Sequence, residues 1–160
     1  MSQYQKITLF LLRISLGWLM FYAGITKILN PTWSAIGYLE NAKTFQSLYF
    51  WLASENISPI ISLINEWAPL LLGVSLLTGT LVRVSTALGI ILMLLYYFPV
   101  LEFPYLSNGR FLIVDDHIIY SVALLLLYIF NTGKYWGVDG FVSGKFKTQK
   151  IPIRYKNRSN

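Results

Sequence analysis

The sequence predicts an all-α integral membrane protein: a bundle of four transmembrane helices with an outer amphipathic helical segment between the first two spans. Hydrophobic residues make up 55% of the 160 residues, and charged residues only 12%, about half the fraction found in soluble domains. Mean hydropathy is +0.54. The apolar residues form long runs, each near the ~20 residues that cross ~30 Å of hydrocarbon. We therefore expect one membrane domain, residues 1–140, followed by a basic cytoplasmic tail, residues 141–160.

Four apolar runs define the expected spans. They are Ile7–Ile28, Ile60–Leu81, Val84–Leu101 and Phe111–Phe130. Pro99 is expected to stop or kink the third span, because proline removes a backbone donor. Pro69 is expected to bend the second span just past Glu66. Such a bend can make room for a ligand, or it can be a tolerated transmembrane proline.

Small residues in the spans predict close helix contacts. Gly17 and Gly24 are seven residues apart and share one face of the first span, and Gly73 lies in the second. Small residues let helix backbones approach one another in lipid. We expect these glycines at helix–helix interfaces.

The segment between the first two spans is expected to be helical rather than a bare loop. Asn30-Pro31 is a helix start signal, and Ser34–Ser54 mixes apolar residues with charged and polar ones. Trp33 and Trp51 have the side-chain type that is enriched at membrane interfaces. The segment is interpreted as a surface anchor, with a lid over a site as the alternative.

Basic residues predict the orientation. The last 16 residues hold six of them: Lys145, Lys147, Lys150, Arg154, Lys156 and Arg158. A basic segment beside a span predicts a cytoplasmic location, and four spans then place both termini there. Attraction to anionic membrane lipid is a second interpretation of this tail. Nucleic acid is not expected as a partner.

Ionisable residues inside the apolar runs are the strongest functional signal. Arg13 interrupts the first run, Glu66 the second, and Asp115-Asp116-His117 lies near the start of the fourth. A charged group at the centre of a bilayer costs roughly 3 kcal/mol on insertion scales unless it is paired or faces water. We expect Arg13 to form a structural ion pair with Asp139, which follows the last span.

The remaining polar groups are expected to form one layer in the outer third of the bundle, since helical rise fixes their depth. Its members would be Lys27, Glu66, Tyr96 or Tyr97, Asp115, Asp116 and His117. His117 is the candidate proton-transfer group, with Asp115, Asp116 and Glu66 as catalytic partners. Lys27, Tyr96, Tyr97 and Arg110 are candidates for substrate or quinone binding. A purely structural polar network is the alternative.

The amino-acid composition limits which redox groups this chain can bind. The chain has no cysteine and one histidine. A thiol relay, an iron–sulfur cluster and a haem with two histidine ligands from this chain are therefore excluded. No metal site is predicted.

Three stretches carry a family resemblance. The first runs from Arg13 to the Gly24-x-x-Lys27 end of the first span, and the second from Glu66 through Gly73 and Gly79 to Arg83. The third is Asp115–Asp139, which ends in Trp136-Gly137-Val138-Asp139. Together they resemble the DoxX/DoxD family of four-span membrane proteins. The Asp-Asp-His start of the last span resembles the DoxD branch more closely.

The resemblance implies a membrane subunit of a quinone-linked oxidoreductase in a prokaryotic plasma membrane. In the DoxD branch the implied reaction is oxidation of thiosulfate to tetrathionate with reduction of a membrane quinone, which is a substrate rather than a bound cofactor. It also implies a second protein subunit. Two alternatives stay open: a non-catalytic membrane scaffold for a redox enzyme, and a carrier of small solutes or protons.

Overall fold

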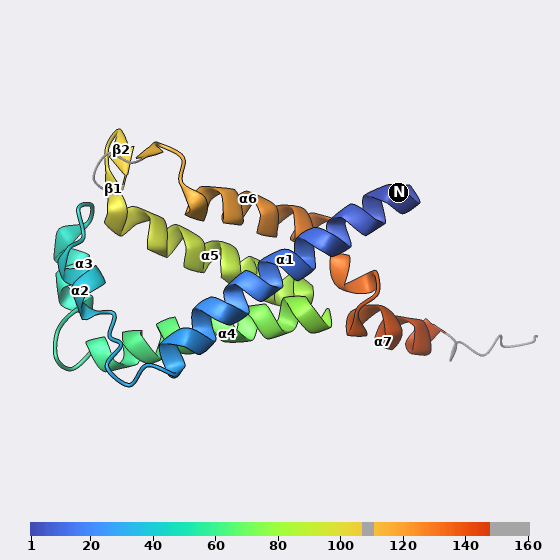
Figure 1. Ribbon diagram of the computed structural model, residues 1–160, viewed down its shortest axis with the longest axis horizontal. Helices are drawn as coiled ribbons and strands as arrows, with labels where there is room; N and C mark the ends of the chain where they lie inside the picture. Colours follow the sequence, from blue (N-terminus) through green and yellow to red (C-terminus); the bar gives the residue numbers. More distant parts are fainter. Residues whose placement is uncertain (107–110, 148–160) are drawn as a thin grey trace, which may run out of the picture.

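The computed structural model describes residues 1–106 and 111–147, and its long axis follows four apolar helices (Figure 1). These helices are α1 (Gln3–Ile28), α4 (Ser58–Thr78), α5 (Val82–Val100) and α6 (Asp116–Ile129). The main contacts join α1 to α4 and α5 to α6, with a smaller contact between α4 and α5. The bundle is thus two helix pairs joined along α4 and α5.

Among the described residues, three helices are long and apolar enough to cross a membrane: α1, α4 and α5. Helix α6 is apolar but has only 14 residues, about 21 Å at 1.5 Å per residue. The predicted start of the fourth span at Phe111 is wrong, because Phe111–Leu112 forms strand β3 and α6 begins at Asp116. The reason is a local one: the Asp115 side chain caps α6 and fixes its first turn there.

Both prolines lie inside helices. Pro69 is a buried residue in the middle of α4. Pro99 does not stop α5, which ends one residue later at Val100. The backbone carbonyl of Pro99 accepts a hydrogen bond from the amide of Lys43, at 2.8 Å, so it joins the end of α5 to the segment between α1 and α4.

Two short helices, α2 (Ile36–Glu40) and α3 (Gln46–Leu52), occupy that segment. They pack across the ends of α4 and α5 around buried Leu39 and Tyr49, with Ile61 and Phe98 against them. The Tyr49 hydroxyl donates to the backbone carbonyl of Leu95 at 3.1 Å. The segment is therefore docked on the bundle by side chains.

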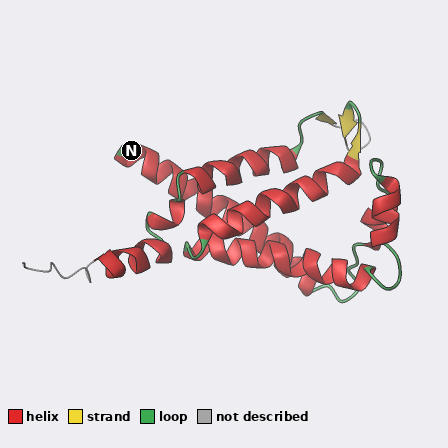
Figure 2. Ribbon diagram, turned by 180° about the vertical axis from the view of Figure 1, so that it is seen from behind, coloured by secondary structure: helices red, strands yellow, loops and turns green. Residues whose placement is uncertain are grey.

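A small antiparallel sheet joins α5 to α6 (Figure 2). Its strands are β1 (Leu101–Glu102), β2 (Tyr105–Leu106) and β3 (Phe111–Leu112), paired in the order β1-β2-β3. The side chain of Leu106 is fully buried. The sheet lies at the same end of the bundle as α2 and α3 (Figure 2).

Glycines bring α1 and α4 together, as predicted. A Cβ at Gly73 would lie 2.3 Å from the backbone nitrogen of Phe21, and one at Gly24 would lie 2.5 Å from the backbone nitrogen of Leu70. Gly17 faces Leu76 and Leu77 of α4. Side chains at these positions would separate the two backbones.

The opposite end of the bundle is closed by the 3₁₀ helix η1 (Thr132–Lys134) and helix α7 (Val138–Lys147). Helix α7 crosses the expected boundary between residues 140 and 141, so part of the segment assigned to the tail is helical. Most of the basic residues of the expected tail lie beyond Lys147, outside the described residues.

Candidate functional site

Asp115 and His117 form a hydrogen-bonded pair at the start of α6. The Nδ1 atom of His117 lies 2.7 Å from a carboxylate oxygen of Asp115, within hydrogen-bond distance. The other oxygen accepts from the amides of His117 and Ile118. Asp115 is 3% exposed and His117 is 28% exposed. Asp115 thus caps the helix and orients an imidazole that solvent or a ligand can still reach.

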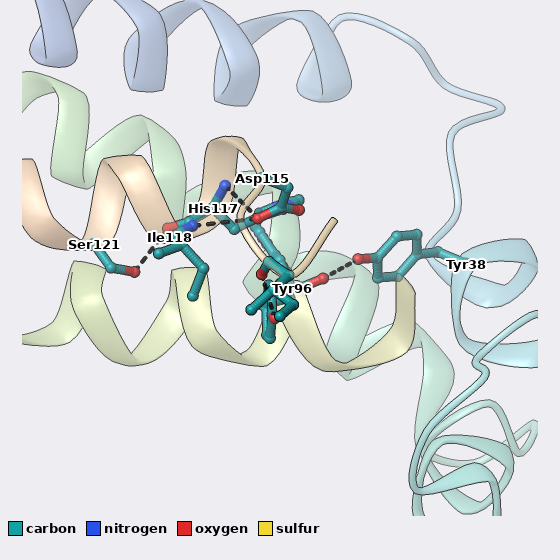
Figure 3. A network of polar contacts seen from close by, with 8 residues as sticks. Tyr38, Tyr96, Asp115, His117, Ile118 and Ser121 are labelled. Atoms are coloured by element: carbon teal, nitrogen blue, oxygen red, sulfur yellow. Dashed lines mark hydrogen bonds and ion pairs between the residues drawn. The ribbon is translucent and has the colours of Figure 1, made fainter. Parts of the chain in front are cut away.

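Tyr96 of α5 lies against this pair (Figure 3). Its ring centroid is 6.0 Å from that of His117, in an edge-to-face arrangement. The Tyr96 hydroxyl is buried and has no hydrogen-bond partner. A buried hydroxyl without a partner has lost its hydrogen bonds to water and gained none from the protein, which costs free energy. Such a group therefore needs an explanation.

Lys27, the last basic residue of α1, also lies near the Tyr96 ring. Its ammonium lies 5.5 Å from the centroid of the Tyr96 ring and 4.8 Å from that of Trp33. It also donates to the backbone carbonyl of Asn65 at 3.2 Å. Glu66 interacts electrostatically with Lys27. Helices α1, α4, α5 and α6 therefore each bring a side chain of the predicted outer layer to one end of the bundle, the His117 end.

Three other predicted residues do not join the Lys27–Tyr96–His117 contacts. Tyr97 is buried on another face of α5 and donates to the backbone carbonyl of Ile113 at 2.6 Å. Asp116 is exposed. Arg110 lies outside the described residues.

Tyr38 of α2 is a residue of this region that the sequence did not single out. Its ring meets that of Tyr96 edge-to-face at 6.4 Å, and its hydroxyl donates to the Tyr96 backbone carbonyl (Figure 3). Burial raises the pKa of Tyr38, and the charge of Asp115 adds to the effect. The aromatic residues of the amphipathic segment were the available signal, but helical periodicity could not say what they face.

The Arg13 end of the bundle has a different arrangement. The Arg13 side chain is fully buried and donates to three backbone carbonyls: Thr132 at 2.6 Å, Tyr135 at 3.1 Å and Trp136 at 3.0 Å. Its Nε has no partner. The predicted direct ion pair with Asp139 is not formed, although the two interact electrostatically.

The carboxylate of Asp139 instead accepts hydrogen bonds from backbone amides. Its carboxylate oxygens accept from Leu81 at 2.8 Å and from Val82 at 3.0 Å. Those are unpaired amides at the start of α5, which a carboxylate satisfies well. Arg13 therefore binds the backbone between α6 and α7, and Asp139 binds the backbone at the start of α5.

One pocket at the His117 end is lined by residues other than those of the predicted outer layer. A hollow of about 310 Å³ lies between α2 and the end of α5, lined by Gly37, Tyr38, Asn41, Lys43, Pro99, Val100 and Glu102. Lys27, Glu66, Asp115 and His117 do not line it. Tyr38 is the residue that connects this hollow to Tyr96. Within the described part of the chain, no cluster of three His, Cys, Asp or Glu side chains could hold a metal ion.

The helices and their buried polar groups define a multi-pass membrane protein. The family model described as DoxX matches residues 8–101, and the chain belongs to the DoxX family. The family resemblance predicted from the sequence is confirmed at that level, and the DoxD branch stays a prediction. The match ends before α6, so it does not include Asp115 and His117. No curated protein and no solved structure matched the chain.

Proposed function

We propose that the chain is the membrane subunit of a quinone-linked oxidoreductase, and that the Lys27–Tyr96–His117 contacts form its quinone head-group site. The observation that carries the proposal is the buried Tyr96 hydroxyl without a partner, beside a histidine that stays partly exposed. The Tyr96 hydroxyl has no acceptor within the protein, and a carbonyl oxygen of a quinone could accept its hydrogen bond.

The chemistry of a quinone site fits the residues. Reduction of a quinone to a quinol takes up two electrons and two protons. Tyr96 offers a hydrogen-bond donor, and the imidazole of His117 is the group that would pass a proton to the reduced quinone. Asp115 accepts a hydrogen bond at Nδ1 of His117, so it fixes the ring orientation and stabilises the charged imidazolium. Lys27 places a positive charge near the ring, where it favours negative charge on a reduced oxygen.

The electrons must come from outside this set of groups. The chain has no cysteine, so it supplies no thiolate relay or iron–sulfur cluster. We propose that a second subunit delivers the electrons or completes the site, with thiosulfate oxidation to tetrathionate as the specific reaction to test first. In this proposal α6 is the fourth span, the His117 end faces the outside and both termini face the cytoplasm of a prokaryotic cell.

A non-catalytic membrane scaffold is the second candidate. The observation favouring it is that the hollow of the His117 end is lined by α2 and α5 rather than by the polar cluster. In that case Lys27, Tyr96 and His117 would only join the helices, and the surface formed by α2 and α3 would dock a redox enzyme.

The test is quinone binding and quinone-linked turnover of the chain purified with its partner subunit. Tyr96→Phe removes the hydroxyl and keeps the ring contacts with His117 and Tyr38. We expect it to weaken quinone binding about fivefold to tenfold, the ~1–1.5 kcal/mol of one hydrogen bond. His117→Ala should lower turnover by roughly 100-fold, the smaller end of the range for general acid–base catalysis.

Tyr22→Phe is the matched control, because Tyr22 is a 60% exposed tyrosine of α1. It should leave binding and turnover unchanged. If Tyr96→Phe and His117→Ala also leave both unchanged while quinone turnover of the wild type is robust, the cluster is structural. If the wild-type complex binds no quinone at all, the scaffold is the function.

A further inference from the structure

Two hollows meet at the Arg13 end of the bundle. One is a groove of about 720 Å³ between α4 and α5, lined almost entirely by apolar side chains from Ile64 to Leu95. The other is a pocket of about 230 Å³ lined by Arg83, Asn131, Lys134, Asp139 and Ser143 together with apolar neighbours. Leu81 and Val84 line both. The polar pocket and the long apolar groove are therefore adjacent.

The charges of the polar pocket favour an anion. Arg83 and Lys134 are exposed cations, and Asp139 is the one carboxylate among the lining residues. Both oxygens of Asp139 already accept backbone amides, so that carboxylate is the least available group. The guanidinium of Arg83 lies 5.1 Å from the centroid of the Tyr128 ring, which holds it beside α6. The pocket has two basic side chains and one carboxylate, which is already hydrogen-bonded. Its net charge is therefore positive.

The groove fits a hydrocarbon chain. Leu71, Val74, Leu88 and Ile91 line it and are between 41% and 61% exposed. It lies on α4 and α5, two of the helices long enough to span a membrane, so its surroundings are lipid. The hydroxyl side chains in its wall pair with one another, Ser75 donating to Ser85 at 2.6 Å and Thr78 to Thr80 at 3.0 Å, so none of them needs a partner from an occupant.

We propose that these two hollows form one binding site for an anionic phospholipid. The phosphate lies between Arg83 and Lys134, and an acyl chain lies along the α4–α5 groove. In a phospholipid the charged head group is joined directly to the acyl chains. The charged pocket and the apolar groove are likewise adjacent, since Leu81 and Val84 line both. The phosphate-binding part of the site lies at the opposite end of the bundle from Tyr96 and His117, and neither of these residues lines the groove, so the proposal does not depend on the proposed quinone function.

The experiment measures lipid retention and thermal stability of the full chain in detergent. Phosphatidylglycerol and phosphatidylcholine with identical acyl chains are compared by native mass spectrometry and by the unfolding midpoint. We expect selective retention of phosphatidylglycerol, a higher midpoint in its presence, and weaker retention as salt is raised. Arg83→Gln and Lys134→Gln should each weaken phosphatidylglycerol binding about fivefold, since one basic residue near an anionic surface contributes ~1 kcal/mol.

Lys6→Gln is the matched control, because Lys6 is a basic residue near the same end that lines neither hollow. It should bind phosphatidylglycerol like the wild type. Equal retention of both lipids, or unchanged binding in both Gln variants, overturns the proposal. So does inorganic phosphate that competes as well as the whole lipid, because the groove would then be unused. A lipid-independent dimer that covers α4 and α5 overturns it as well, with a second copy as the occupant.

Discussion

The two ends of the bundle use buried polar side chains in opposite ways. At the Arg13 end, Arg13 and Asp139 bond to backbone groups of other elements. At the His117 end, Tyr96, His117 and Asp115 lie against one another, and the Tyr96 hydroxyl has no partner. A side chain bound to backbone fixes the position of chain segments. Titratable side chains that contact one another can exchange protons and accept a ligand, so the difference separates a structural junction from a candidate site.

The largest effect should come from Arg13→Leu. It leaves the carbonyls of Thr132, Tyr135 and Trp136 buried without their donor. We expect a loss of about 3–5 kcal/mol in the free energy of unfolding, because each buried acceptor left without a donor costs about 1–3 kcal/mol. The measurement is the unfolding transition in detergent. Lys6→Leu is the control on the same helix, and equal stability of Arg13→Leu and wild type would show that this junction is not structural.

A glycine pair sharpens the same comparison. Gly79 has a φ of 72°, and a Cβ there would lie 2.5 Å from the Cα of Gly137, whereas Gly37 at the other end has open space. Gly79→Ala should destabilise by about 1–3 kcal/mol through overpacking and backbone strain. Gly37→Ala, the matched control, should be neutral or stabilise by up to ~1 kcal/mol as a helix residue. Similar unfolding midpoints for the two variants would contradict a tightly packed Arg13 end.

Asp115 allows the cap and the proton chemistry to be separated. Asp115→Asn keeps an oxygen that can accept the amides of His117 and Ile118, so stability should change by less than ~0.5 kcal/mol. Quinone-linked turnover should fall at least tenfold, because the carboxylate no longer stabilises a charged His117. Asp115→Ala should lose the same activity and about 1 kcal/mol of stability as well. Full turnover in Asp115→Asn would show that Asp115 is only a helix cap.

The smallest effect concerns the docking of α3. Burial raises the pKa of Tyr49, so the folded protein holds this proton more tightly than the unfolded chain, whose tyrosines titrate near ~10. The contribution to stability is complete below about pH 10 and declines as the pH rises above it. The unfolding midpoint should therefore decrease as the pH is raised above about 10, and it should decrease less in Tyr49→Phe. Tyr4→Phe, at an 83% exposed tyrosine, should follow the wild type.

Much of this fold could be predicted because apolar runs report burial in lipid directly. The cores of α1, α4 and α5 match the expected spans, and helical rise correctly placed Lys27, Glu66 and His117 at one end. The start of α6 was placed too early, because apolar residues alone do not separate strand β3 from a helix. An Asp before the apolar run, Asp115, was the missed signal for the helix start.

The polar partners were harder to predict than the elements. The sequence indicated that Arg13 needs a partner, and an acid was the natural expectation. The partners are carbonyls of a turn with positive φ at Asn131 and Trp136, and tertiary packing decides that geometry. The contact of Tyr38 with Tyr96 likewise depends on how α2 folds back onto α5, which periodicity cannot specify.

The most direct test of the central claim uses the fact that His117 is the only histidine in the chain. A sample labelled with ¹⁵N-histidine gives imidazole signals from His117 alone. Adding a short-chain quinone to the protein in nanodiscs should shift these signals saturably, with an apparent Kd that is weaker in Tyr96→Phe and unchanged in Tyr22→Phe. Imidazole signals that do not move at saturating quinone, in a sample that demonstrably binds quinone, would contradict the assignment of the His117 end as the site.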